Sequence, residues 1–285
     1  MKKRILLICG SILLVISIIL FNTFVVNPKQ LHVRQVNITS NKIDSDIDGL
    51  KIAYFSDLHF GFTSNQLIED TIDKINLYKP DIIVFGGDLI DHLNENGINN
   101  EDKTYLINLL NKLESKYGNY AIIGNHDHIG YDDSSIYEEI LQEANFKILK
   151  NQNIQIYIDN NSFINLIGID SSSYQTIDTI SAFNNLNNDT YTFIFSHTPD
   201  SFDEISGYPF DYFVAGHSHG GQIYIPIISY FTKAFGYENH LRGKSTINNK
   251  VLDISNGVGI TKTKGRLNAD SEIVIYQLNQ NKTAD

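Results

Sequence analysis

The chain has almost no sulfur-containing side chains. Its 285 residues include a single cysteine, Cys9, a single methionine and no tryptophan. Cys9 lies inside an apolar segment near the N-terminus, so the rest of the chain has no thiol. Disulfide bonds, a cysteine nucleophile and cysteine metal ligands are therefore excluded after that segment. Any metal site in the rest of the chain must use nitrogen and oxygen ligands.

Positive charge is also scarce. The sequence has 22 Lys and Arg against 33 Asp and Glu, which gives a formal net charge of -11. A broad nucleic-acid groove needs basic surface to neutralise phosphates, so we do not expect nucleic acid as a partner. The length and the 42% hydrophobic content suffice for one large α/β domain or two small ones. Because we find no internal repeat and no low-complexity linker, we expect one domain.

The N-terminus carries a long apolar run. Lys2-Lys3-Arg4 precede about 22 residues without charge, Ile5 to Val26, and a helix needs roughly 20 to cross a bilayer. A cleaved signal peptide, the alternative, would have a core of roughly 7–15 residues and a small-x-small site, which Phe21–Val26 does not offer. Since basic residues stay in the cytoplasm, we predict an uncleaved single-pass anchor over residues 1–28. Residues 30–285 would then form an extracytoplasmic domain.

The first half of the domain alternates between short apolar runs and amphipathic segments. Ser64 is a predicted N-cap, and Pro80 is a predicted helix breaker. We predict helices at 65–78 and 102–117 and strands at 31–39, 50–55, 82–85 and 120–123. This β-α-β-α-β order implies neighbouring parallel strands with right-handed crossovers.

The pattern changes after residue 127. Ser135 and Glu138 predict a capping box for a helix that ends at Ala144. Closely spaced strands then predict a meander, and hence a second, mostly antiparallel sheet. The strands predicted in this half are 146–149, 154–158, 163–169, 191–195, 212–215, 223–225, 251–254 and 272–278. We therefore expect one domain built from two packed sheets.

Five segments become polar directly after an apolar run. The central one is Gly124-Asn125-His126-Asp127. The others are Ser56-Asp57-Leu58-His59, Gly86-Gly87-Asp88, Ser196-His197-Thr198-Pro199-Asp200 and Gly216-His217-Ser218-His219-Gly220-Gly221-Gln222. In open α/β sheets ligands bind where strands end, so we expect the five segments to form one site. The strand period of two would place Asp57 and His59 on the same side.

The residue types in these segments point to metal chemistry. Their Asp, Asn and His side chains supply nitrogen and oxygen ligands, which suit Mn, Fe, Zn, Ni or Co without choosing among them. Eight such residues exceed what one ion can use, so two ions that share Asp88 are the economical arrangement. Two ions about 3.5–4 Å apart are a known device for phosphate-ester hydrolysis. Each motif taken alone is better explained as a polar turn; together, in this order, they are not.

These segments resemble the calcineurin-like metallophosphoesterase superfamily over residues 50 to about 278. The segments around His197 and His217, with Gly257-Val258-Gly259-Ile260, are similar to a membrane- or cell-wall-associated bacterial branch of UDP-2,3-diacylglucosamine-type phosphoesterases. The resemblance implies two sets of ligands, Asp57, His59, Asp88 and His219 for one ion and Asp88, Asn125, His197 and His217 for the other. It also implies that His126 protonates the leaving oxygen and that Asp127 orients His126.

Other candidates receive ordinary explanations. His32 and His240 are not expected to be ligands, and Asp91 is expected to brace its own loop. His92 and His128 adjoin the motifs, which leaves open that they support the ligands from behind. Residues 233–266 carry seven Lys and Arg against two acids, and 223–235 is rich in large apolar residues. One hypothesis is that this region lines the site mouth and admits an anionic amphiphile at a membrane surface. A strand followed by solvated charges explains it equally well.

We therefore expect a four-layer α/β sandwich, with two mixed β-sheets flanked by helices, plus one N-terminal transmembrane helix. The expected function is metal-dependent phosphoester hydrolysis by two divalent ions, manganese among the candidates, that activate a bridging hydroxide. The expected substrate is a phosphodiester or pyrophosphate in a membrane lipid or envelope glycoconjugate. A phosphomonoesterase or nucleotidase, or a non-catalytic envelope-binding module, is the alternative. The Asn- and Ile-rich composition points to an AT-rich bacterium.

Overall fold

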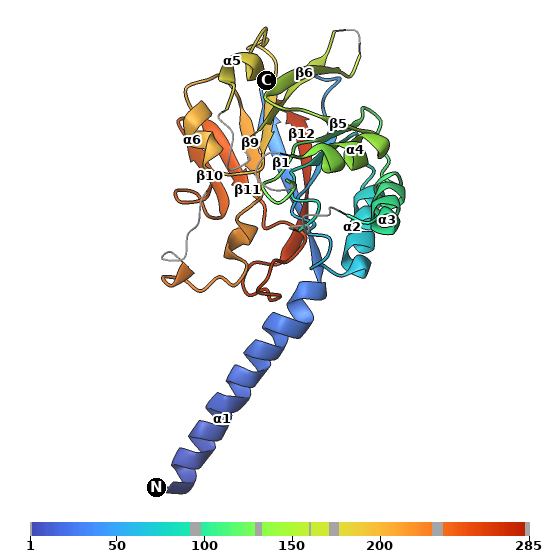
Figure 1. The fold of residues 1–285 in the computed structure, drawn as a ribbon. Coiled ribbons are helices and arrows are strands. Elements are labelled where there is room, and N and C mark those ends of the chain that lie inside the picture. The colour runs from blue at the N-terminus through green and yellow to red at the C-terminus, as the bar shows by residue number, and fades with distance from the viewer. Residues whose placement is uncertain are drawn as a thin grey trace.

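Two six-stranded sheets pack face to face, and helices cover their outer faces (Figure 1). The computed structural model describes residues 2–91, 98–128, 133–159, 161–170, 177–229 and 236–282. Both sheets contain parallel and antiparallel neighbours. The predicted fold class, two mixed sheets flanked by helices with an apolar N-terminal helix, is confirmed.

The first sheet contains the strands predicted in the first half of the domain. Its order is β1 (Leu31–Ser40), β12 (Ser271–Gln280), β2 (Lys51–Phe55), β3 (Ile82–Phe85), β4 (Asn119–Ala121) and β5 (Phe146–Ile148). β12 runs antiparallel to β2, and every other neighbouring pair is parallel. The helices α2 (Asn65–Leu77), α3 (Asn100–Leu110) and α4 (Ser135–Glu143) belong to this half.

The second sheet is mostly parallel, so the prediction of a mostly antiparallel sheet is wrong. Its order is β10 (Gly243–Ile247), β11 (Lys250–Ile254), β9 (Tyr212–Ala215), β8 (Thr192–Ser196), β7 (Phe163–Ile169) and β6 (Gln152–Tyr157). Only the edge strands β10 and β6 run antiparallel to their neighbours. About twenty residues separate β7 from β8, more than the dozen or so that a parallel crossover needs. β5 belongs to the first sheet, so the meander is reduced to the β6–β7 hairpin.

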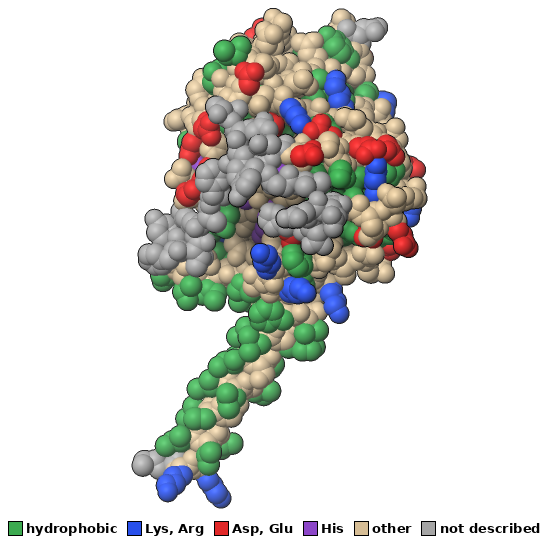
Figure 2. All heavy atoms as spheres, in the orientation of Figure 1, with side chains coloured by type: hydrophobic (Ala, Val, Ile, Leu, Met, Phe, Trp, Pro, Cys, Tyr) green, Lys and Arg blue, Asp and Glu red, His purple; other side chains and the backbone are tan. Residues whose placement is uncertain are grey.

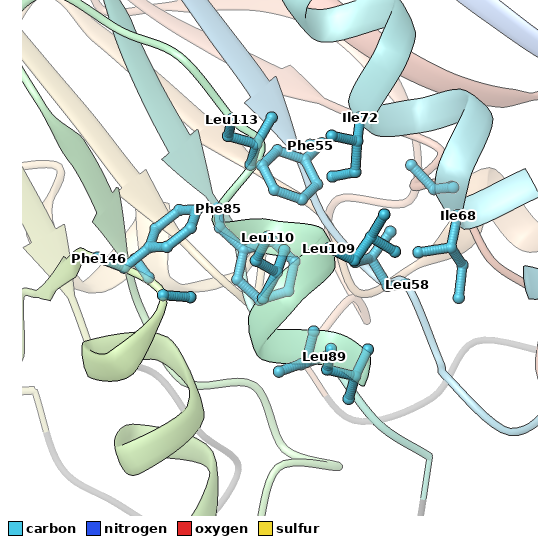
Figure 3. Packing of buried hydrophobic residues seen from close by; sticks show 14 of the residues in the cluster. Phe55, Leu58, Ile68, Ile72, Phe85, Leu89, Leu109, Leu110, Leu113 and Phe146 are labelled. Atoms are coloured by element: carbon cyan, nitrogen blue, oxygen red, sulfur yellow. The ribbon is translucent and has the colours of Figure 1, made fainter. Parts of the chain in front are cut away.

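Apolar side chains fill the spaces between the layers. On β2, Ala53 and Phe55 pack toward α2 and α3, while Ile52 and Tyr54 pack between the two sheets. Figure 3 shows the first of these clusters, in which Phe55 and Phe85 meet leucines and isoleucines of the helices. A third cluster lies against α5 (Thr179–Ala182) and α6 (Ser201–Ile205). Because each central strand is covered on both faces, its sequence is continuously apolar instead of alternating.

Several predicted boundaries shift. The Ser64 side chain accepts from Leu67 N, as expected of an N-cap. α3 ends at Leu110 instead of 117. Ser134, not Ser135, stands at the start of α4, and its hydroxyl donates to Glu138. Residues 223–225 form no strand but a single bridge between Ile223 and Leu267. β10 was missed because its residues are polar and exposed.

The helix α1 (Lys2–Phe21) projects from one end of the domain (Figure 1). Apolar side chains line it, and the basic residues stand at its far end (Figure 2). Its continuation through residues 22–29 contacts the domain: Arg266 N donates to Thr23 O at 2.9 Å, and Asn27 Nδ2 donates to Arg266 O at 3.0 Å. The span of residues 2–29 is long and apolar enough to cross a membrane. It is therefore compatible with a single-pass anchor.

Candidate active site

The five polar segments meet at one place. They follow the carboxyl ends of β2, β3, β4, β8 and β9, and therefore bring residues from both sheets together. The predicted residues found within this cluster are Asp57, His59, Asp88, Asn125, His126, His197, His217 and His219. Asp127 lies beneath the cluster, as described below. A site assembled from distant parts of the sequence is what the motif positions predicted.

An unusual backbone conformation shapes these segments. The φ angles of five site residues are positive, with values of 57° at Asp57, 44° at His59, 58° at Asp88, 64° at His217 and 50° at His219. Such angles are uncommon outside glycine and cluster at functional sites. β2 ends at Phe55, so strand alternation does not place Asp57 and His59 together. The left-handed turn that follows the strand does.

The first group of side chains contains Asp57, His59 and His219. The Nε2 atoms of the two imidazoles lie 3.0 Å apart, and Asp57 Oδ1 lies 3.6 Å from His219 Nε2. The Asp57 carboxylate accepts hydrogen bonds from the Ser56 hydroxyl and from His217 N. Gly257 allows this packing, because a Cβ there would lie 2.7 Å from Asp57 Oδ2. A neighbouring hydroxyl, a backbone N–H from the His217 segment and the close approach of Gly257 therefore hold Asp57 in place.

The second group contains Asp88, Asn125, His197 and His217. His197 Nδ1 donates to the Gly86 carbonyl at 2.8 Å, which turns the Nε2 atom toward the site. His197 Nε2 lies 2.9 Å from Asn125 Oδ1, 3.2 Å from Asp88 Oδ2 and 3.2 Å from His217 Nδ1. Oxygen and nitrogen atoms that converge in this way can hold a cation between them.

Asp88 belongs to the second group and also lies beside the first. Its Oδ2 is 3.5 Å from His59 Nε2 in the first group and 3.2 Å from His197 Nε2 in the second. Its Oδ1 accepts from His126 N at 2.8 Å. Gly87, at φ 87°, allows the tight turn, because a Cβ there would lie 2.6 Å from Gly124 N. This central position is the one expected of a shared ligand.

The electrostatics of the cluster favour added positive charge. Burial raises the pKa of Asp57 to about 6. Burial also opposes the charge of Asp88, but His197 and His126 outweigh it and hold the pKa of Asp88 well below its usual range. Burial likewise opposes the proton of His197, yet Asp88 raises the pKa of His197 to about 9. A divalent cation would supply the positive charge that two buried carboxylates require. The donor set therefore fits divalent metal ions.

Among the described contacts of His126, the carboxylate at its imidazole is Asp91 and not Asp127. His126 Nδ1 lies 2.7 Å from Asp91 Oδ1, and the His126 side chain is 21% exposed. Burial lowers the pKa of His126, but Asp88 and the Asp91 contact outweigh burial, so the pKa is raised. Asp91 was expected only to brace its loop. The spacing Gly-Gly-Asp88-x-x-Asp91 is the signal that could have identified it.

Asp127 is buried and contacts backbone. Its carboxylate accepts from the N–H groups of Asp88, Leu89 and Gly124 at 2.8–2.9 Å and of Ile90 at 3.3 Å. Burial raises the pKa of Asp127 to about 7, although these N–H groups act in the opposite direction. None of these described hydrogen bonds joins Asp127 to His126, so the expectation that Asp127 orients the imidazole stays a prediction. The Asp127 carboxylate ties the loops after β3 and β4 together.

Arg266 lies beside the site, although its place among basic residues suggested a solvated charge. The side chain is fully buried, and its guanidinium donates to the carbonyls of Ala269, Asn256, Gly257 and Gly259. Burial lowers the pKa of Arg266 to about 10. The loop at 256–259 packs against Asp57, so Arg266 supports that carboxylate from behind. Nothing in the local sequence distinguishes Arg266 from its exposed neighbours Lys262 and Lys264.

The remaining candidates lie elsewhere. His32 lies 4.0 Å from Asp270, and His240 contacts Asp203. His128 is buried, with Nδ1 3.2 Å from the Gly124 carbonyl. His92, like residues 230–235, which include several of the large apolar residues noted in the sequence, lies outside the described residues.

Comparison with known proteins identifies similar chains. The Calcineurin-like phosphoesterase family model matches residues 50–221, which include all five polar segments. The uncharacterized metallophosphoesterase YkuE of Bacillus subtilis is 30% identical over 254 residues, covering 88% of this chain and 86% of YkuE. UDP-2,3-diacylglucosamine pyrophosphatase LpxG of Chlamydia trachomatis is 26% identical over 246 residues, covering 70% and 72%. Phosphodiesterase YaeI of Escherichia coli is 28% identical over 231 residues, covering 80% and 82%.

Proposed function

The chain belongs to the calcineurin-like phosphoesterase family and is a hydrolase, and we propose that it cleaves phosphodiester or pyrophosphate bonds with two divalent metal ions. The proposed ligands of one ion are Asp57, His59, Asp88 and His219, and those of the other are Asp88, Asn125, His197 and His217. The position of Asp88 between the two groups carries this proposal. The donor set suits Mn, Fe, Zn, Ni or Co.

The side chains near the ions have separate tasks in this proposal. When bound, two such ions supply the charge that activates a water molecule and neutralises the phosphoryl oxygens. His126 gives a proton to the leaving oxygen, and Asp91 holds the imidazole through Nδ1 so that Nε2 remains for the substrate. Asp57 and Asp88 are held by backbone N–H groups, which keeps them in place during turnover.

The proposed substrate is a phosphodiester or pyrophosphate in a membrane lipid or envelope glycoconjugate. Two observations support it: the similarity to LpxG, which is named a UDP-2,3-diacylglucosamine pyrophosphatase, and the apolar helix α1. In this proposal residues 1–28 are the transmembrane anchor and residues 30–285 the extracytoplasmic phosphoesterase domain. Removing residues 1–28 would leave Arg266 without its hydrogen bonds to Thr23 and Asn27, which supports an anchor that stays attached.

The test is hydrolysis by the full chain in detergent. We expect Mn²⁺-loaded protein to cleave bis(p-nitrophenyl) phosphate faster than p-nitrophenyl phosphate, and EDTA to abolish both reactions. His126→Ala should keep its metal content, measured by mass spectrometry, but lose turnover about 10²–10⁴-fold. His32→Ala is the matched control, because His32 is exposed on β1 and far from the ligands in sequence.

The other outcomes favour other functions. Preference for the monoester would indicate a phosphomonoesterase or nucleotidase. Metal-loaded protein that cleaves neither compound, nor a set of lipid and glycan phosphodiesters, would indicate a binding module. Loss of metal in His126→Ala would make His126 a ligand and overturn the roles given above.

A further inference from the structure

A turn next to the active-site segment exposes three isoleucines. Ile225, Ile227 and Ile228 are 40%, 79% and 58% exposed. The turn is braced, because Ser229 N donates to Ile225 O and Ile225 N donates to the Ser229 hydroxyl, both at 2.9 Å. Ile227 has a φ of 73°, an uncommon angle for a β-branched residue. We call residues 225–229 the isoleucine turn; its hydrogen-bonded backbone presents apolar side chains to solvent.

The isoleucine turn is joined to the end of the N-terminal helix. Tyr224 N donates to Leu267 O at 2.8 Å, and Arg266 N, one residue earlier, donates to Thr23 O at 2.9 Å. These hydrogen bonds place residues 266–267 between residue 23, at the end of the helix, and the isoleucine turn. Figure 1 shows these segments at the end of the domain from which α1 projects, and Figure 2 shows green side chains along that edge.

Basic side chains lie on the segments that join the turn to the helix. Lys29 follows the helix, and Lys262 and Lys264 precede Arg266; all three are exposed. They stand out on a protein with a formal net charge of -11. Exposed apolar side chains flanked by lysines fit the boundary between anionic headgroups and acyl chains. Scattered exposed isoleucines need no explanation, but three on one braced turn beside an apolar helix do.

We propose that the isoleucine turn, with Lys262 and Lys264, docks on the anionic surface of the membrane that α1 spans. Ile227 and Ile228 enter the acyl boundary, and the lysines contact lipid phosphates. The turn begins three residues after Gln222, in the segment that carries His217 and His219, so docking orients the site relative to the bilayer. The inference rests on the anchor of the proposed function but not on hydrolysis.

The absence of tryptophan makes the test direct. Ile227→Trp gives the chain a single tryptophan, and the full chain is reconstituted in vesicles that contain phosphatidylglycerol and phosphatidylcholine. We expect blue-shifted emission and quenching by lipids brominated in the acyl chains. The matched control is Ile180→Trp, because Ile180 is 82% exposed on α5, at the opposite end of the domain in Figure 1. It should emit as in water and resist quenching.

A tryptophan at a second position of the turn and the removal of two lysine charges test the docking further. Ile228→Trp should behave like Ile227→Trp, and Lys262→Gln with Lys264→Gln should reduce quenching in anionic vesicles but not in neutral ones. If both tryptophans near the anchor emit like Ile180→Trp, the docking proposal is overturned. Cleavage of bis(p-nitrophenyl) phosphate is measured on the same samples. Docking without cleavage would count against the proposed function alone, and cleavage without docking against this inference alone.

Discussion

Two aspartates near His126 have different partners, and this separates two roles at the scale of single residues. Asp91 Oδ1 lies 2.7 Å from the imidazole, whereas Asp127 accepts only backbone N–H groups among its described hydrogen bonds. Both carboxylates are buried. We therefore assign the orientation of His126 to Asp91 and the cohesion of the loops to Asp127.

Asp91→Asn should slow turnover by about 10–100-fold, the range typical of a carboxylate that orients a functional imidazole. Asp91 helps to raise the pKa of His126, so its removal lowers that pKa. A proton donor works below its pKa, and the alkaline limb of the pH–rate profile should therefore move to lower pH. The measurement is turnover against pH at equal metal content. An unshifted alkaline limb would mean that Asp91 does not act through His126.

Asp127→Asn is the comparison variant, and its main effect should be on stability. The amide cannot accept from all four N–H groups, because one oxygen becomes an NH₂ donor. We expect the free energy of unfolding to fall by about 1–3 kcal/mol, the usual cost of a buried polar group without a partner. Denaturant unfolding with EDTA present measures this without a contribution from bound metal.

At the scale of elements, the loops hold one another's side chains. The carboxylate of Asp57, after β2, accepts from His217 N, after β9, and faces Gly257, after β11. The carboxylate of Asp88, after β3, accepts from His126 N, after β4. The positive φ angles of the five site residues are therefore stabilised by contacts between loops, because these residue types do not favour such angles by themselves. Their strain is compensated only when both sheets are assembled.

Gly257→Ala should weaken metal binding. The added Cβ would lie 2.7 Å from Asp57 Oδ2, and alanine is strained at the φ of 67° found there. Displacement of Asp57 should lower the affinity for Mn²⁺ about 10–100-fold, as for other residues that position ligands. Isothermal titration calorimetry measures the affinity. Gly207→Ala is the matched control, because its Cβ meets nothing within 4 Å, and equal affinities for both variants would contradict the role of Gly257.

At the scale of the whole molecule, a partly buried ion network joins the two sheets. Arg34 on β1 donates to Asp253 on β11 through two contacts of 2.9 Å, and to Glu272 on β12 at 3.2 Å. The hydroxyls of Tyr212 and Tyr276 also donate to Asp253. The network lies where the first and second sheets meet, so it favours one alignment of the sheets over others.

Arg34→Met should lower the free energy of unfolding by about 3–5 kcal/mol, because it leaves Asp253 buried without its cation. Replacing both partners, with Arg34→Met and Asp253→Leu, should cost less than the single change, since the remaining charge is then removed. Urea unfolding of the two variants and the parent protein tests this. If the double variant were less stable than Arg34→Met, the remaining charge on Asp253 would itself stabilise the protein, and the expectation would be wrong.

Local residue patterns were enough to identify the mixed two-sheet fold, the apolar N-terminal helix, the five polar segments and the family. Each of these depends on neighbouring residues: an apolar run followed by Asp, His or Asn shows where a buried strand ends. Contacts between distant segments were needed for the rest. The parallel direction of β7 and β8, the pairing of His126 with Asp91 instead of Asp127, and the burial of Arg266 all depend on partners far away in the sequence. Periodicity predicts which face of a strand is buried. It does not predict the direction of a side chain in a left-handed turn, nor which distant segment buries a side chain such as that of Arg266.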